Sequence, residues 1–182
     1  AVRIRNLELN LKSNTAGYWW KVNTFKMADP GQMNATFMYT DTWGIYQGTV
    51  DNLTDGDSST ALDFRTSGDR TRKGDYIGWD LGKETAIGKI HAVIGGDRSA
   101  GDKWEKYSLQ YSNDNQNWTT YKTYQGVASG KDTVEENFYG LKARYVRLVN
   151  EEERAVWVIF SEFSVKAYNP DEDFNNANVY TK

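Results

Sequence analysis

The sequence predicts an all-β fold, an antiparallel sandwich or barrel, from two observations. Short runs alternate apolar and polar side chains, as at residues 107–111, 145–149 and 163–168, and a period of two residues is typical of a half-buried strand. Clusters of turn-forming residues, as at 95–97 and 112–117, separate such runs, and no long segment keeps a helical period. Strands joined by short turns favour an antiparallel arrangement.

The composition limits what the chain can be. Its 182 residues suit one domain with appendages, and its aromatic content of 14% supplies enough large side chains for a core. It contains no cysteine, which excludes disulfides and thiolate catalysis. The net charge of −3 comes without a basic cluster, so a nucleic acid is not an expected partner. No apolar run reaches the roughly 20 residues of a membrane span.

The start of the chain has two readings. Residues 2–4 followed by 19–27 are similar to residues 146–148 followed by 156–165, since both describe two strands with a Trp before the second. Strand patterns are degenerate, so chance explains the similarity equally well. The alternative is that residues 1–28 are an extra strand pair or the remnant of an upstream module. We expect the main domain at 29–168 and an Asp- and Asn-rich linker at 169–182.

The segment 55–60, with the sequence Asp-Gly-Asp-Ser-Ser-Thr, is the strongest local signal. Its carboxylates lie two residues apart on a Gly-containing turn, and the hydroxyl of Thr60 follows. Such oxygens can converge on Ca²⁺, which takes six to eight oxygen ligands at about 2.3–2.6 Å. Taken alone, the segment also suits an Asx turn that holds no metal.

Five blocks together identify a family. The segments 55–60, 75–82, 107–118, 143–148 and 161–165 resemble, in order and spacing, the discoidin-like (coagulation factor V/VIII type C) family. The resemblance covers about residues 34–168. Within the family, the chain is most similar to the family 32 carbohydrate-binding modules of bacterial glycoside hydrolases, including hexosaminidases and hyaluronidases.

This resemblance implies a discoidin-like jelly roll, an antiparallel β-sandwich with eight strands and a structural calcium ion. Glu162 lies about a hundred residues from the other side-chain ligands, so the ion would join distant parts of the chain. The ligands implied are the carbonyl of Asn52, the side chain of Asp55, Asp57, both oxygens of Thr60, the carbonyl of Ser161 and the carboxylate of Glu162.

The resemblance also places a sugar among the loops 42–47, 64–75, 95–104 and 150–157. An aromatic ring can cover the apolar face of a pyranose while charged or amide groups bind its hydroxyls. Trp157 is the leading candidate. The leading candidates are Trp157, Trp43, Tyr46, Phe64, Arg65, Asp63, Asp97, Arg98 and Asn150. The same loops hold four more charged residues that can bind hydroxyls, Asp69, Arg70, Asp102 and Arg154.

The expected sugar follows from one position at which this chain differs from the galactose-binding members of the family. Galactose-binding members of the family have a His after the Thr of the calcium segment, where this chain has Asp63. We therefore expect N-acetylglucosamine or a related N-acetylhexosamine disaccharide from a host glycan. The single histidine, His91, falls within a predicted strand, so we expect a structural residue of the sheet and not a residue that contacts the ligand.

No catalytic machinery is evident, because the chain lacks cysteine, a nucleophile motif and a phosphate loop. We expect a non-catalytic module, secreted or on the surface of a bacterium, that is covalently linked to a glycoside hydrolase and other modules. Two alternatives remain open. One is a discoidin-like adhesion module that binds protein or lipid head groups, and the other is a jelly-roll enzyme that degrades polysaccharide.

Overall fold

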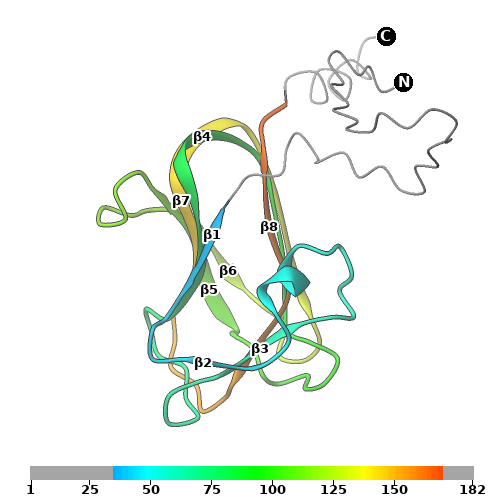
Figure 1. Cartoon of the computed structure of the whole chain (residues 1–182). Coiled ribbons are helices and arrows are strands. Elements are labelled where there is room, and N and C mark those ends of the chain that lie inside the picture. Colours follow the sequence, from blue (N-terminus) through cyan, green and yellow to red (C-terminus); the bar gives the residue numbers. More distant parts are fainter. Residues whose placement is uncertain (1–34, 170–182) are drawn as a thin grey trace, which may run out of the picture.

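The computed structural model describes residues 35–169. The predicted strand pair at 1–28 and nearly all of the predicted linker lie outside these residues. The described chain forms strands and one short 3-10 helix, η1 (Figure 1). Their bounds are β1 Thr36–Tyr39, β2 Gly44–Gln47, η1 Val50–Leu53, β3 Leu62–Arg65, β4 Tyr76–Ile94, β5 Lys106–Ser112, β6 Thr119–Gln125, β7 Asp132–Asn150 and β8 Val158–Ala167.

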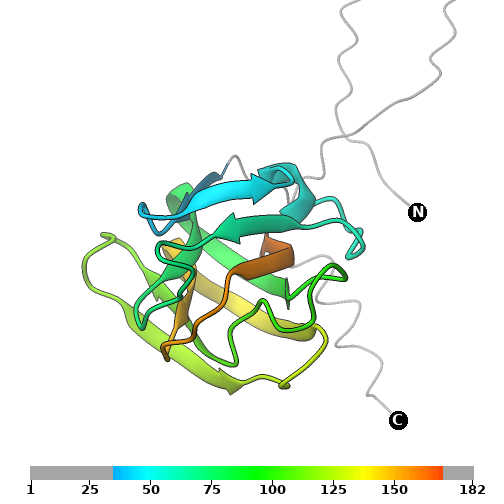
Figure 2. The ribbon, with the colours of Figure 1, turned by 90° about the horizontal axis from the view of Figure 1, so that it is seen from below.

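Two long strands, β4 and β7, build both layers of the fold. They pair with each other along most of their length, and the register shifts between Asp80 and Thr85 where the pair bends. Before the bend, β4 lies beside β1, and β7 continues to β5 and β6. Beyond it, β4 pairs with β8, which leads to β3 and β2. The eight antiparallel strands therefore fold over into a sandwich (Figures 1 and 2), which confirms the predicted fold class.

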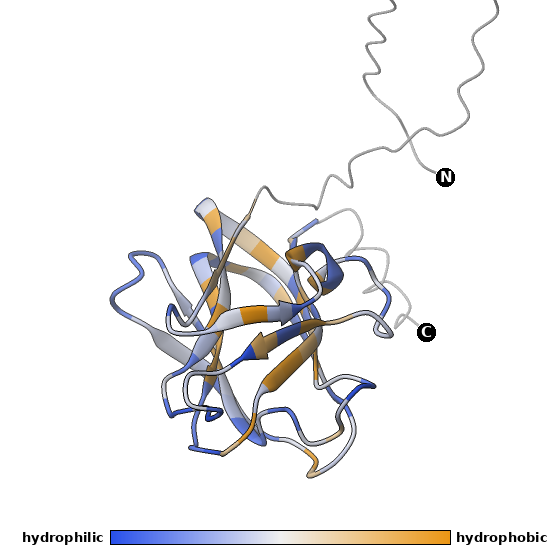
Figure 3. Ribbon diagram, turned by 60° about the horizontal axis from the view of Figure 1, so that its bottom comes forward, coloured by the Kyte–Doolittle hydropathy of each residue, from blue (hydrophilic) through white to orange (hydrophobic). Residues whose placement is uncertain are grey.

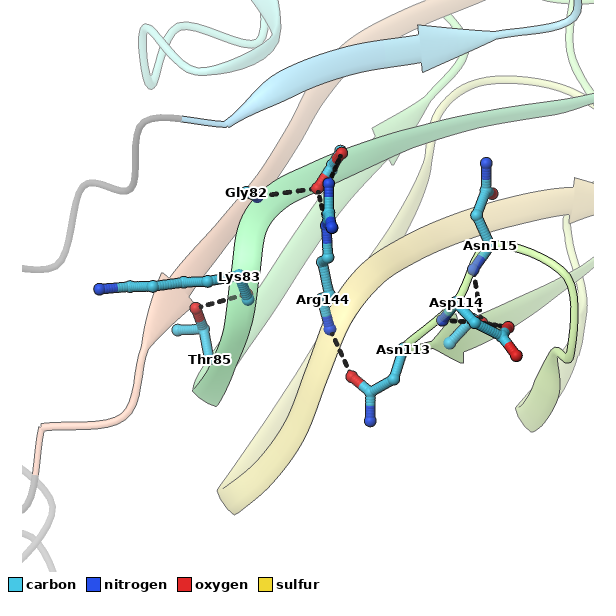
Figure 4. Close-up of polar contacts among 9 residues, drawn as sticks. Gly82, Lys83, Thr85, Asn113, Asp114, Asn115 and Arg144 are labelled. Carbon is cyan, nitrogen blue, oxygen red and sulfur yellow. Dashed lines mark hydrogen bonds and ion pairs between the residues drawn. The ribbon is translucent and has the colours of Figure 1, made fainter.

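The bend has a local cause. Gly82 has a φ of +76°, a conformation that glycine adopts without the strain a Cβ atom would add. Arg144 braces the same corner, because its guanidinium donates two hydrogen bonds of 2.9 Å to Asp80. The backbone N–H of Arg144 also donates to the side-chain oxygen of Asn113 over 2.9 Å (Figure 4). Arg144 thus links β4, β7 and the loop after β5.

The core lies between the two layers and is rich in aromatic rings. Hydrophobic residues, orange in Figure 3, recur along the strands of the sandwich. Trp79 from one layer and Phe163 from the other are buried, and the Trp79 indole N–H donates to the Phe163 carbonyl over 2.9 Å. Aromatic pairs of this kind add to the free energy gained by burying their area. Within the described residues, no helix has the length and apolar character needed to cross a membrane.

A buried ion pair attaches the loop 95–105 to the β-sandwich. Lys103 is fully buried and lies 3.1 Å from Asp132 at the start of β7. The carbonyl of Lys103 accepts a hydrogen bond of 2.9 Å from Arg154. The loop 95–105 is therefore fastened both to β7 and to the loop between β7 and β8.

Candidate functional site

An aromatic ledge formed by Tyr46 and Trp157 lies at the loop end of the sandwich. The Tyr46 side chain on β2 is 56% exposed, and Trp157, just before β8, is partly exposed. Their ring centroids are 5.0 Å apart with the planes at 62°. The rings come from segments more than a hundred residues apart, so the sandwich fold alone brings them together. The structure places these two predicted residues side by side.

Charged side chains fix and border the ledge. The Trp157 indole N–H donates a hydrogen bond of 2.6 Å to Asp69 Oδ1. Arg65 Cζ lies 5.8 Å from the Trp157 ring centroid, and Arg98 Cζ lies 5.1 Å from that of Tyr46. Arginine at such distances is attracted to the electron-rich face of a ring. The ledge therefore combines apolar rings with several hydrogen-bond donors and acceptors.

A hollow of about 270 Å³ adjoins the ledge, and Asp63, Asp97 and Arg98 line it. Asp63 is 4% exposed and forms an ion pair with Arg98. Burial raises the pKa of Asp63, and the positive charge of Arg98 opposes that shift. Asp97 also forms an ion pair of 2.8 Å with Lys131 Nζ. These three predicted residues therefore face a common polar space next to the rings.

The predictions for Trp43, Phe64 and Asn150 are wrong, because the fold buries all three. Trp43 is 5% exposed, and Phe64 and Asn150 are fully buried. Trp43 and Phe64 pack against each other in the core with centroids 5.4 Å apart, so no ring face is open to a ligand. The Asn150 side chain donates to the carbonyls of Arg72 and Glu152. Its role is to hold two loops together.

Asp69, one of the charged residues predicted in the loops at this end, holds the Trp157 ring. Its φ of +52° belongs to the left-handed region that Asp tolerates better than most residues. This conformation occurs in the turn after β3, from which the carboxylate reaches Trp157. A Ser-Gly-Asp sequence indicates a turn, but the partner 88 residues away is set by the tertiary fold.

The predicted metal segment is a tight network of oxygens beside η1. Asp55 accepts hydrogen bonds from the Thr60 hydroxyl over 2.7 Å, from the Asp57 backbone N–H over 2.8 Å and from the Asn52 amide over 3.3 Å. The bonds from Asp57 and then Thr60 lower the pKa of Asp55. The Thr60 hydroxyl also lies 3.0 Å from the Asp57 carbonyl. The side chains of Asp55 and Thr60 and the Asp57 carbonyl therefore converge.

Glu162 of β8 completes this region. It is 3% exposed, and its Oε1 is buried without a hydrogen-bond partner. Burial and then the charge of Asp55 raise the pKa of Glu162. A buried carboxylate oxygen without a partner is costly, and a cation would satisfy it. Ser161 is fully buried beside it, and its hydroxyl donates to the Gly95 carbonyl over 2.8 Å.

The donor set suits a calcium ion more than a transition metal. Among residues 35–169, no three histidine or acidic side chains converge closely enough to hold a metal by themselves. An ion here would need hydroxyl and carbonyl oxygens in addition to carboxylates, and calcium accepts all of these ligands. The residues present therefore fit the predicted ion.

Comparison with known proteins adds a family and a set of similar folds. Residues 32–163 match the family described as F5/8 type C domain, which is more than half of the chain. No curated protein matches the sequence. Among solved structures, a carbohydrate-binding module, CBM32-1, of a family 31 glycoside hydrolase from Clostridium perfringens is 18% identical with a TM-score of 0.56, covering 75% of this chain and 94% of its own.

Two further modules from the same bacterium are also similar in fold. The family 32 module of NanJ, solved with galactose, is 16% identical with a TM-score of 0.54, covering 72% of this chain and 93% of its own. CpGH89CBM32-5, solved with GalNAc-β-1,3-galactose, is 21% identical with a TM-score of 0.51, covering 72% and 95%.

Proposed function

Because this chain belongs to the F5/8 type C domain family, we propose that it binds carbohydrate at the Tyr46–Trp157 ledge and catalyses no reaction. The observation that carries the proposal is the exposed Tyr46 ring beside the partly exposed Trp157 ring, with charged side chains around both. Trp157 offers a flat apolar surface that Asp69 holds in place, while Arg65 lies over the Trp157 ring and Arg98 over the Tyr46 ring. A pyranose has an apolar face and a polar edge, so it needs both kinds of group.

The energetics favour a weak site. Covering about 100 Å² of one ring contributes roughly 2.5 kcal/mol, while a millimolar dissociation constant needs about 4 kcal/mol. Hydrogen bonds to Arg98 and the neighbouring carboxylates would supply the remainder. We therefore propose retention through repeated contacts, where linked modules or repeated ligands raise the effective concentration.

For the ligand, we propose an N-acetylhexosamine unit, as in N-acetylglucosamine or a related disaccharide of a host glycan. Asp63 stands where galactose-binding members of the family have a His. Asp63 forms an ion pair with Arg98. The carboxylate is a hydrogen-bond acceptor and the guanidinium is a donor, and the two lie next to each other in the lining of the hollow. The acetamido group needs both a donor and an acceptor. The similar module CpGH89CBM32-5 was solved with a GalNAc-containing disaccharide, which supports this class.

Isothermal titration with N-acetylglucosamine, N-acetylgalactosamine and galactose tests the proposal. We expect millimolar binding of the N-acetylhexosamines and weaker binding of galactose. Trp157→Ala should weaken binding roughly 50-fold without lowering the melting temperature. Trp118→Ala is the matched control, because Trp118 is also partly exposed but covers Arg147 at 3.7 Å. Absence of binding to any of these sugars at high millimolar concentration would contradict the proposal.

For the parent protein, we propose a secreted or surface glycoside hydrolase of a bacterium in which this module holds the catalytic domain near its substrate. The support is the similar fold of CBM32-1, which comes from a family 31 glycoside hydrolase. Deleting the module from such an enzyme should reduce activity on insoluble or cell-surface glycan and leave activity on a small soluble substrate unchanged.

We also propose that Asp55, Thr60, Glu162 and the Asp57 carbonyl hold a calcium ion, together with carbonyls of Asn52 and Ser161. The ion would stabilise the domain by joining the η1 region to β8, and it would take no part in sugar binding. The unpartnered Glu162 oxygen supports this assignment.

One observation favours a second function. Ile45, beside Tyr46 on β2, is 46% exposed, and neighbouring apolar side chains at a loop end suit a lipid surface or a protein partner. Sedimentation with vesicles of phosphatidylserine and phosphatidylcholine distinguishes the two functions. Co-sedimentation that Ile45→Ser abolishes, together with no sugar binding, would favour this alternative.

A further inference from the structure

A second hollow lies on the side of the sandwich, away from the aromatic ledge. It has a volume of about 590 Å³ and is lined by the outer faces of β4, β7 and β8 and by the 54–58 segment. This size lies within the range of small-molecule sites, roughly 300–1,000 Å³. We call it the side trough. The ledge residues Tyr46 and Trp157 are not among the residues that line it.

Strand register arranges the floor of the side trough in rows. Lys89 on β4 lies opposite Lys166 on β8, which gives a basic row. His91 lies between Ser164 and Glu135 in the next outward-facing row. Residues two apart on a strand point to the same face and lie about 7 Å apart. The register alone therefore sets two lysines side by side at one end of the trough.

Lys166 is the unusual member of the basic row. Its side chain is exposed, and that side chain has no ion pair or hydrogen bond with any residue in the described part of the chain. Its neighbour Lys89 shares Glu135, 2.7 Å away, with His91, which lies 3.6 Å from the same carboxylate. Glu135 is the carboxylate that pairs with this cationic cluster. The other two carboxylates that line the trough, Asp55 and Glu162, belong to the proposed calcium site, and Glu162 lies opposite Val93, four residues along β4 from Lys89. Positive charge is therefore left over at the Lys166 end of the trough, and negative charge at the other end.

Four of the remaining lining residues carry hydroxyl groups, and they lie among Val93 and the carboxylates of Asp55 and Glu162. Ser164 and Thr133 contribute side-chain hydroxyls from the floor, and Thr54 and Ser58 contribute others from the opposing wall. Each hydroxyl can both donate and accept. Aromatic rings are not among the lining residues, so this trough cannot hold a neutral sugar by stacking. The Lys166 end therefore suits an anion, and the rest of the trough offers hydroxyls and carboxylates to the hydroxyl groups of a ligand.

We propose that the side trough binds an acidic saccharide residue, with the carboxylate or sulfate on Lys166 and Lys89 and the sugar hydroxyls along Ser164 and Thr133. Such a site is separate from the ledge. A glycan chain with acidic units could therefore be held at two places on one domain, which raises the effective concentration at each.

Chemical-shift mapping with methyl β-glucuronide tests the proposal, with methyl β-glucoside as the neutral match and inorganic sulfate as the bare anion. We expect the glucuronide to shift amide signals of β4 and β8 near Lys89 and Lys166, and the glucoside to shift none of them. Lys166→Gln should weaken glucuronide binding about tenfold. Lys83→Gln, an exposed lysine of β4 outside the trough, should leave it unchanged.

A second variant should change the affinity in the opposite direction. Glu135→Gln removes the carboxylate that competes for Lys89 and should tighten glucuronide binding about threefold. Equal binding of glucoside and glucuronide, or of bare sulfate and glucuronide, would overturn the assignment, as would the absence of any shift at the trough. Trp157→Ala leaves the trough intact, so loss of ledge binding in that variant tests the proposed function separately.

Discussion

The indole N–H of Trp157 donates a hydrogen bond of 2.6 Å to Asp69 Oδ1, across 88 residues of sequence. This bond joins the loop after β3 to the loop before β8 and fixes the orientation of the ring. A stacking surface that is already oriented loses less side-chain entropy when a ligand binds. The bond therefore links the conformation of two loops to the affinity of the ledge.

Removing the Asp69 carboxylate should weaken sugar binding about tenfold, because the ring then loses a charge-assisted hydrogen bond and must be ordered by the ligand. Asp69→Gly is the appropriate variant, since the φ of +52° at this position would strain an alanine. Asp69→Asn, which keeps an acceptor oxygen, should restore most of the affinity in isothermal titration. Equal affinity in Asp69→Gly and the unchanged protein would contradict the role of this bond.

Breaking the buried ion pair should destabilise the domain strongly. Lys103→Met leaves Asp132 without its cation in a buried environment and should lower the free energy of unfolding by about 3–5 kcal/mol. Lys103→Met with Asp132→Asn should recover part of this loss, because the charge is gone and Asn can still accept from the Val127 backbone N–H.

Urea unfolding measures these losses in free energy. Lys106→Ala, an exposed lysine of β5, serves as the control for Lys103 and should change stability by less than about 0.5 kcal/mol. A double variant that is no more stable than Lys103→Met would show that packing, and not the unpaired charge, accounts for the loss.

Calcium should raise the melting temperature. At a concentration one hundred times its dissociation constant, a ligand that binds the folded state alone adds about 2.7 kcal/mol, which for a domain of this size shifts the transition by several degrees. Glu162→Gln removes the buried carboxylate and should abolish most of the shift, whereas Asp41→Asn, on an exposed turn, should preserve it. A melting temperature that neither calcium nor chelator changes would exclude the ion.

Acid should remove the stabilisation that Asp80 and Arg144 provide. The hydrogen bonds from Arg144 lower the pKa of Asp80 below its ordinary value of 3.8. A lowered pKa in the folded state means that the stabilisation is complete above pH 3.8 and is lost as the pH falls through the folded value. Thermal melts should therefore show Asp80→Asn less stable than the unchanged protein at pH 7, with a difference that narrows below about pH 4. A difference that stays constant with pH would contradict this.

The sequence was sufficient for the fold because the fold depends on patterns that repeat along the chain. Alternating polarity predicted strands that correspond to β5, β7 and β8, and His91 lies in β4 as expected. The family resemblance at about residues 34–168 is confirmed by the match at 32–163. The calcium ion and the hexosamine ligand remain predictions.

The candidate site was predicted less accurately, because exposure is decided by the orientation of a strand and not by residue type. Three consecutive residues of β3, Leu62, Asp63 and Phe64, are all buried, which a simple alternation does not predict. Asp63 is buried against Arg98 while Phe64 enters the core.

By itself, then, the sequence determined that the chain is a β-sandwich of this family with oxygen-rich and aromatic loops. The tertiary structure decided which rings are exposed, which loops touch and where charge is unbalanced. The Tyr46 ring contacts the Trp157 ring, and Asp69 accepts a hydrogen bond from the Trp157 indole. Lys166 lies opposite Lys89 on the neighbouring strand. Each of these relationships joins residues that are distant in sequence, and only strand register and layer packing bring such residues within the few ångströms at which side chains interact.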